Sequence, residues 1–223
     1  MGHALDTIKE FFVQGGPFMY VNLVFSAVAV ALIIERTIAL IRASVNGGPF
    51  MNQLIKQVRE GHIDRAVKLC AAAPNAALAR VLRAGLSRAN RGEQEVASAL
   101  EEAILEVTPT LQKRIGSLWS VANIATLTGL IGTISGLIGS FKALGKASPA
   151  QKAELLSKGI SEAMNNTAFG LSIAVVCIIG HLLLTNRSKS RIEELELNSM
   201  TLENLLARRA AGEVNPAEQD KAL

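Results

Sequence analysis

Residues 129–140 read Gly-Leu-Ile-Gly-Thr-Ile-Ser-Gly-Leu-Ile-Gly-Ser and lie inside an uncharged run over residues 115–141. A run of this length can cross a bilayer, because about 20 apolar residues span the hydrocarbon core. On a helix, one ridge of small side chains recurs every four residues: Thr128, Gly132, Gly136 and Ser140. Such a ridge lets a second helix approach closely, whereas lipid would favour Leu and Val. We therefore predict a membrane helix that faces protein.

Two further uncharged runs, residues 11–34 and 163–186, make three candidate membrane spans in all. Hydrophobic residues make up 49% of the chain and aromatic residues only 4%, so its apolar mass is aliphatic. We predict an all-α integral membrane protein with three transmembrane helices, at residues 18–41, 115–145 and 159–186. The second and third helices are expected to extend into a cytoplasmic helical domain.

Basic residues are distributed unevenly around these spans. Residues 42–118 hold eleven Lys and Arg against seven Asp and Glu, the tail after Asn186 holds six more Lys and Arg, and only Lys9 precedes Phe11. The positive-inside rule therefore places the N-terminus outside and both the loop and the tail in the cytoplasm. This topology also accounts for the net charge of +4 without nucleic-acid binding. Two of the remaining predicted segments are external: the N-terminal segment (residues 1–17) and a short segment between the second and third spans (residues 146–158). The other two are cytoplasmic: a helical loop (residues 42–114) and a helix with its tail (residues 187–223).

The first apolar run is expected to remain in the protein as a membrane anchor. Asp6 and Glu10 surround Lys9, so the run lacks the basic flank of a signal peptide. Glu35 and Arg36 near its cytoplasmic end are typical of interfacial anchoring residues, and a functional role for the pair is the alternative.

The loop is predicted to form four helices, each ended by Gly or Pro, at residues 51–60, 63–73, 76–90 and 93–107. Their periodic apolar residues are expected to form a small core or an intersubunit collar: Leu54, Val58, Ala66, Leu69, Leu78, Val81, Leu82 and Leu86. No strand is predicted in this section.

The second span is predicted to lie on a longer helix. We expect residues 109–147 to form one uninterrupted helix of roughly 58 Å, which is longer than the bilayer is thick. Its first turns should therefore project into the cytoplasm. A short external helix is expected over residues 149–158, and Gly159 is expected to open the third span.

The chain offers no enzymatic site that we can identify. It has no Gly-rich phosphate loop, no Ser/His/Asp grouping and no metal-ligand spacing, so we expect no enzyme activity, no cofactor and no metal. Cys70 and Cys177 would lie on the reducing side and within the membrane, so no disulfide is expected. His181 is interpreted as a packing residue, with a proton relay as the alternative. Four arginines are interpreted as a solvated or headgroup-facing surface rather than a nucleic-acid site: Arg80, Arg83, Arg88 and Arg91.

The Gly-Leu-Ile-Gly-Thr-Ile-Ser-Gly-Leu-Ile motif of residues 129–138 resembles the second membrane helix of the MotA/TolQ/ExbB proton-channel family. Residues 159–171, Gly-Ile-Ser-Glu-Ala-Met-Asn-Asn-Thr-Ala-Phe-Gly-Leu, are similar to the family's third-helix pattern of Glu, Thr and Gly-Leu. Glu35-Arg36 and residues 78–85, Leu-Ala-Arg-Val-Leu-Arg-Ala-Gly, also match. These four ordered matches cover most of residues 16–185, and they are closer to ExbB and TolQ than to MotA, which has an additional membrane helix.

The resemblance implies that Thr133 and Thr167 line an ion route, and counting along the helices places both in the outer half of the membrane. From the residues alone, the alternative is that each hydroxyl bonds a carbonyl one turn earlier. Glu162 stands at the family's position for a pore or intersubunit role, and the alternative is an interfacial Glu near a helix start. Asn166, where the family usually has small or aliphatic residues, completes the expected ion path. The expected helix-packing residues are Gly129, Gly132, Gly136 and Gly170.

No Asp, Glu, Lys or Arg lies in the middle of any predicted span, so the chain lacks an ionisable relay of its own. The resemblance implies a ring of five such subunits among the lipids of the bacterial inner membrane. This ring would surround two copies of an ExbD/TolR-like single-span partner, whose membrane Asp supplies the missing carboxylate. Proton flow would then drive work through a TonB/TolA-like or other envelope protein. The alternatives are a structural membrane scaffold without ion conduction and an enzyme that uses the loop, and the missing catalytic grouping disfavours the latter.

Overall fold

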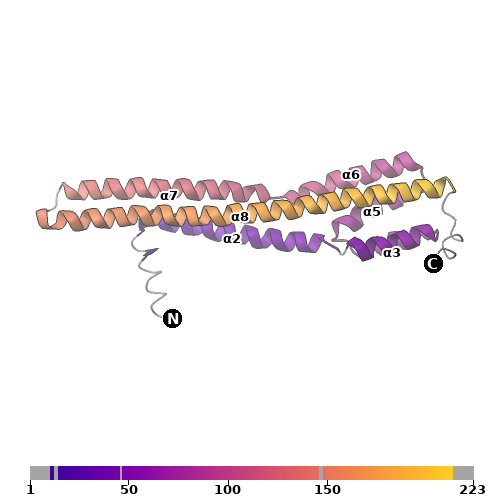
Figure 1. Cartoon of the computed structure of the whole chain (residues 1–223), viewed down its shortest axis with the longest axis horizontal. Coiled ribbons are helices and arrows are strands. Elements are labelled where there is room, and N and C mark those ends of the chain that lie inside the picture. Colours follow the sequence, from indigo (N-terminus) through magenta and orange to yellow (C-terminus); the bar gives the residue numbers. More distant parts are fainter. Residues whose placement is uncertain (1–10, 13–14, 46, 146–147, 213–223) are drawn as a thin grey trace, which may run out of the picture. The chain divides into compact units, whose positions relative to one another are not determined.

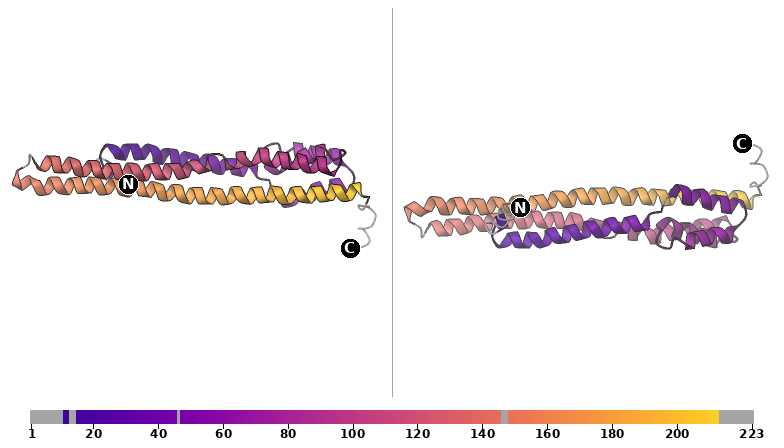
Figure 2. Two further views of the ribbon diagram at one scale, coloured as in Figure 1. Left: turned by 90° about the horizontal axis from the view of Figure 1, so that it is seen from above. Right: turned by 90° about the horizontal axis from the view of Figure 1, so that it is seen from below.

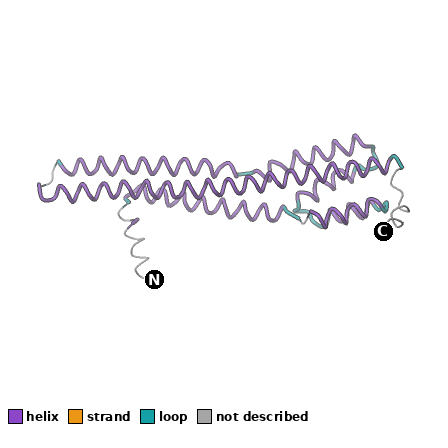
Figure 3. Tube along the Cα trace, in the orientation of Figure 1, coloured by secondary structure: helices purple, strands orange, loops and turns teal. Residues whose placement is uncertain are grey.

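The computed structural model describes residues 11–12, 15–45, 47–145 and 148–212, and within this part every regular element is a helix (Figures 1 and 3). The helices bounded within the described residues are, in order, α2 (Gly16–Ala43), α3 (Gly47–Arg59), α4 (Ile63–Ala71), α5 (Ala77–Ser87), α6 (Glu93–Gln112), α7 (Ile115–Leu144) and α8 (Pro149–Ala210). Three of the described helices, α2, α7 and α8, carry segments long and apolar enough to cross a membrane. The predicted fold class, an all-α protein with three membrane spans, is confirmed.

The chain divides into two compact units. The span unit comprises residues 1–36 and 114–184, and the loop unit comprises residues 37–113 and 185–223. The predicted N-terminal segment, the middle of the predicted external segment and the end of the predicted tail lie outside the described residues, and the boundaries of the membrane itself stay predictions.

In the span unit, α2 and α8 run parallel to each other and α7 runs antiparallel to both. For α2 and α8 the direction follows from two contacts, Gly16 with Glu162 and Ile33 with Gly180. For α7 and α8 it follows from Gly136 with Ala163 and Gly129 with Gly170. Both views in Figure 2 show the three helices side by side over this unit. Mostly small side chains form the centre of their packing: Ala29, Val121, Ala122, Ala125, Ile173, Ala174 and Cys177. Large aliphatic side chains face outward instead, including Val24, Leu127, Ile131, Ile134, Val175 and Leu182.

The junction of α6 and α7 corrects the prediction of one uninterrupted helix from residue 109. Pro109 lies inside α6, which ends at Gln112, and α7 begins at Ile115. Arg114 between them takes a left-handed conformation with φ 58°, which is uncommon for a residue with a side chain. Its Nη1 lies 2.6 Å from Oε1 of Glu35 in α2, and both residues belong to the span unit. Residues 112–115, Gln-Lys-Arg-Ile, contain no glycine or proline, so no residue type predicts the break.

The start of α8 corrects a second boundary. The separate helix expected over residues 149–158 and the third span are one continuous helix from Pro149 to Ala210. Gly159 does not end a helix, because one glycine in a helix costs only about 1 kcal/mol relative to alanine. Its missing side chain instead makes room for Ser140 of α7, whose Oγ and Cβ lie where a Cβ on Gly159 would be.

In the loop unit, α3 packs on α4, α4 on α5, and α5 on α6. Seven of the eight predicted core residues are buried, and Leu69 is partly buried. Cys70 is also buried, and burial raises the pKa of its thiol to about 11, which favours an inert packed thiol over a reactive one. Cys70 and Cys177 are both free, as expected.

Replacing Gly85 by alanine should destabilise the loop unit. A Cβ on Gly85 in α5 would lie 2.6 Å from Cδ2 and 2.8 Å from Cγ of Leu100 in α6. Overpacking of this kind costs about 1–3 kcal/mol, and a thermal melt of the purified protein should reveal it. Gly48→Ala is the matched control, because no atom lies within 4 Å of its Cβ position.

Leu100→Ala should partly rescue Gly85→Ala, because it removes the atoms with which the new Cβ collides. The double variant should therefore lose less stability than the sum of the two single variants. Strictly additive losses would contradict the proposed contact.

Candidate functional site

The ridge predicted on the second span is buried against α8 of the same chain. Thr128, Gly132, Gly136 and Ser140 are all buried, and Gly129 is buried beside them. The protein that this ridge faces in the structure is therefore the third span. A substitution in the ridge acts on the fold of the single chain before it acts on any assembly.

The four glycines expected to pack helices all lie in this contact, which we call the α7–α8 seam (Gly129, Gly132 and Gly136 on α7; Ala163, Asn166 and Gly170 on α8). A Cβ on Gly170 would lie 2.7 Å from the carbonyl oxygen of Ala125 and 3.2 Å from Cα of Gly129. A Cβ on Gly132 would lie 2.7 Å from Cγ of Asn166. At Gly129 and Gly170 backbone meets backbone, so no larger residue fits there without a shift, whereas a Cβ on Gly136 would lie 3.4 Å from its nearest neighbour, the amide nitrogen of Ala163.

The two threonines of the predicted ion path have different hydrogen bonding. The hydroxyl of Thr133 donates to the carbonyl oxygen of Leu130 at 2.6 Å, which is the back-bonded arrangement. The hydroxyl of Thr167 is buried and has no hydrogen-bond partner among the described residues. The two hydroxyls are not bonded to one another. The Thr167 hydroxyl is thus available to bind another group, whereas the Thr133 hydroxyl already donates its proton to the carbonyl oxygen of Leu130.

Asn166 ties α8 to the start of α2. Its side chain is 1% exposed, and its Nδ2 donates to the carbonyl oxygens of Gly15 at 2.5 Å and of Glu162 at 3.1 Å. Its Oδ1 is buried without a partner among the described residues. Asn166 therefore holds the start of α2 through its Nδ2, and its Oδ1 remains an unused hydrogen-bond acceptor.

Glu162 lies beside the same helix start. Its carboxylate occupies the place where a Cβ on Gly16 would be, and its Cγ lies 3.6 Å from the Cβ position of Gly136. Gly16 is the first residue of α2, so the carboxylate stands at the end of the helix whose dipole favours negative charge. The structure thus brings Glu162 and Asn166 together at the start of α2.

Asn22 of α2 belongs to the same region, and the sequence analysis missed it. Its side chain is 0% exposed, and neither its Oδ1 nor its Nδ2 has a partner among the described residues. Nδ2 lies 3.3 Å from the Cβ position of Gly170, which is one helical turn from Asn166. Its residue type could have drawn attention to it, because Asn22 is the only Asn or Gln in the predicted span of residues 18–41.

Asn22, Asn166 and Thr167 together form what we call the polar node. Four of its atoms are buried without a partner: both amide atoms of Asn22, Oδ1 of Asn166 and Oγ1 of Thr167. Each such group costs about 1–3 kcal/mol when it is left unsatisfied. The node is therefore the part of the span unit best suited to interact with a polar guest such as water or an ion.

Other ionisable groups of the span unit lie away from the polar node. The rings of His181 and Trp119 lie 6.0 Å apart, near the opposite end of the unit from Glu162, which is consistent with a packing role. Glu35 pairs with Arg114 at the helix junction. The described residues contain no group of three or more His, Cys, Asp or Glu side chains that could hold a metal.

Comparison with known proteins gives one family match and several relatives. Residues 73–197, more than half of the chain, match the model of the MotA/TolQ/ExbB proton channel family. A biopolymer transport protein of the ExbB-like type from Synechocystis is 32% identical over 157 residues, which cover 70% of this chain and 74% of the relative. An ExbB homolog in biopolymer transport from Methanothermobacter thermautotrophicus is 28% identical over 148 residues, or 66% of this chain. That match spans 52%, about half, of the methanogen protein.

Gly170→Ala should lower the melting temperature of the purified protein, because the new Cβ would meet the backbone of Ala125 and Gly129. A cost of about 1–3 kcal/mol is expected from overpacking. Gly139→Ala is the control on α7, since Gly139 is exposed and has no atom within 4 Å of its Cβ position. Equal melting temperatures for the two variants would show that the α7–α8 seam does not limit stability.

Proposed function

Because the chain belongs to the MotA/TolQ/ExbB proton channel family, as its motifs predicted, we propose that it is an ion-conducting, ExbB/TolQ-like subunit of a motor driven by the proton-motive force. The family is a transport family, and no enzymatic step is proposed. The observation that supports the proposal is the polar node, since an ion or water route through the spans needs polar atoms that are free to solvate the ion or water.

The proposed route passes Thr167 and Asn166 on α8, with Thr133 and Glu162 beside them. Thr167 contributes an unused hydroxyl, and Asn166 contributes an unused carbonyl oxygen. Thr133 keeps an acceptor lone pair although its proton is committed to Leu130. The two hydroxyls and the amide can solvate a moving ion but cannot themselves change charge, and Glu162, which can, lies at the edge of the predicted span.

The relay that changes charge is proposed to come from a partner. No Asp, Glu, Lys or Arg lies in the middle of the predicted spans, so proton transfer needs a carboxylate from elsewhere. We propose five copies of this chain around two copies of an ExbD/TolR-like single-span protein whose membrane Asp supplies it. Ion flow would rotate one component against the other and drive work in the envelope through a TonB/TolA-like or similar protein.

We propose that the chain lies in the inner membrane with its N-terminus in the periplasm, on the basis of the distribution of Lys and Arg. Reporter fusions at Asn90 in the loop and at Gln151 near the start of α8 should report opposite compartments. Reporters on the same side would contradict the three-span topology.

Thr167→Val should abolish ion-dependent work by the whole complex while leaving the fold intact. Valine keeps the β-branched shape and removes a buried hydroxyl that has no partner, so the melting temperature should stay equal or rise. Thr167→Ser should recover part of the activity, because it restores the hydroxyl. Thr133→Val should have a smaller effect than Thr167→Val, since the Thr133 hydroxyl already bonds Leu130.

Thr126→Val is the matched control, because the Thr126 hydroxyl donates to Ala122 at 3.0 Å and is not among the proposed route residues. Activity should be measured in cells or vesicles with the partner present, and assembly should be checked by native mass spectrometry. Full activity of Thr167→Val in an intact complex would favour the structural scaffold without ion conduction.

A further inference from the structure

A groove of about 500 Å³ lies in the loop unit between the last turns of α2 and the neighbouring part of α8. Two arginines, three hydroxyl side chains and two aliphatic side chains line it: Thr37, Leu40, Ile41, Ser44, Arg187, Ser190 and Arg191. Such a lining combines donors for an anion with an apolar wall. It contains no carboxylate.

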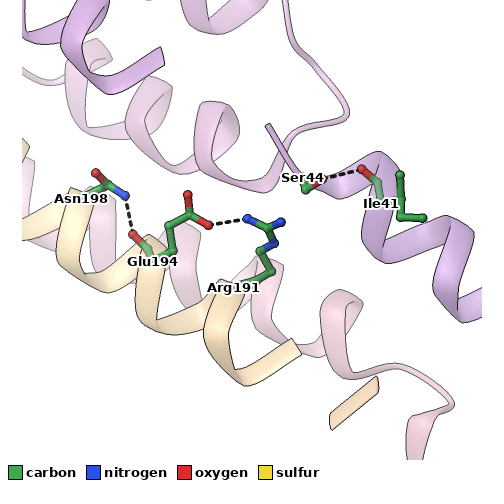
Figure 4. Close-up of polar contacts among 5 residues, drawn as sticks. All are labelled: Ile41, Ser44, Arg191, Glu194 and Asn198. Atoms are coloured by element: carbon green, nitrogen blue, oxygen red, sulfur yellow. Dashed lines mark hydrogen bonds and ion pairs between the residues drawn. The ribbon is translucent and has the colours of Figure 1, made fainter. Parts of the chain in front are cut away.

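The two arginines differ in how far they are neutralised. Nη1 of Arg191 lies 2.7 Å from Oε2 of Glu194, and Figure 4 shows this pair one turn before Asn198. Arg187 is exposed and has no ion-pair or hydrogen-bond partner among the described residues. Ser44 donates to the carbonyl oxygen of Ile41, as Figure 4 also shows. The groove therefore keeps a net positive charge, which Arg187 supplies.

The groove lies where two predicted spans end. Ile41 is the last residue of the first predicted span, and Arg187 is the first charged residue after the third. At this depth the aliphatic wall of Leu40 and Ile41 would meet acyl chains, and the guanidinium groups would meet headgroup phosphates. Basic pockets between membrane helices on the cytoplasmic side suit anionic headgroups, and the planar fork of arginine matches phosphate.

We propose that this groove binds the phosphate of an anionic phospholipid from the cytoplasmic leaflet. Arg187 and Arg191 donate to the phosphate oxygens, and Ser190 adds a hydroxyl donor. Leu40 and Ile41 contact the part of the acyl chains nearest the glycerol. The inference rests on the proposed topology and not on the ion route. Lipid binding is measured without ion flow, so failure of either proposal can be told from failure of the other.

The test is lipid retention by the full-length protein in native mass spectrometry, with phosphatidylglycerol and phosphatidylcholine added in parallel. Arg187→Gln should lower phosphatidylglycerol binding about fivefold, the contribution expected of one basic residue at a membrane surface. Lys189→Gln is the matched control, because Lys189 is exposed two residues away and does not line the groove. Arg187→Lys should fall between wild type and Arg187→Gln, since it keeps the charge but loses the fork.

Thermal melts of each variant show whether the chain remains folded. Inorganic phosphate is added in a separate arm, and it should compete weakly because it lacks acyl chains for Leu40 and Ile41. Equal losses in Arg187→Gln and Lys189→Gln would overturn the proposal in favour of general surface charge. Equal retention of the two lipids, or displacement of phosphatidylglycerol by millimolar phosphate alone, would also overturn it.

Discussion

The approach of the α7 backbone to the α8 backbone at Gly129 and Gly170 is the constraint on which the span unit depends. A Cβ on Gly170 would lie 3.2 Å from Cα of Gly129, so neither lipid nor a side chain can enter between them. Lipid chains are as apolar as leucine, and therefore the hydrophobic effect does not hold these helices together. Contact between closely spaced backbones does so instead, and α2 covers the pair through Asn22 and the bond from Asn166 to Gly15.

Both units bury uncharged polar atoms that have no hydrogen-bond partner among the described residues: Asn22, Asn166 and Thr167 in the span unit, and Gln57, Ser188 and Ser199 in the loop unit. The span unit buries uncharged amide and hydroxyl groups, whose unsatisfied atoms favour a polar guest. In the loop unit the ion pairs are largely at the surface, as in Arg80 with Glu106, and pairs of this kind contribute little stability. The stability of the loop unit rests instead on buried aliphatic residues such as Leu82 and Val58.

Much of the fold followed from the sequence because its signals were periodic and strong. The spans, the loop helices and the buried face of Gly132 and Gly136 all rest on such patterns. The junction of α6 and α7 was predicted wrongly, because Pro109 is tolerated inside α6 while Arg114 forms a break that no residue type announces. The helix boundary predicted at Gly159 was also wrong, because a single glycine is tolerated inside α8. The candidate site was predicted less completely. Asn22 reaches the polar node only through the docking of α2 on α8, and no local pattern encodes that contact.

The α7–α8 seam also bears on the order in which the protein is made. The two helices follow one another in the chain, so closing the connection between them costs little entropy, and they can pair as soon as both are inserted. The bond from Asn166 to Gly15 instead joins residues 151 positions apart. During biogenesis, α7 and α8 are therefore expected to pair early as a hairpin. Helix α2 is expected to insert separately and to pack on the surface of α7 and α8 only after that hairpin has formed.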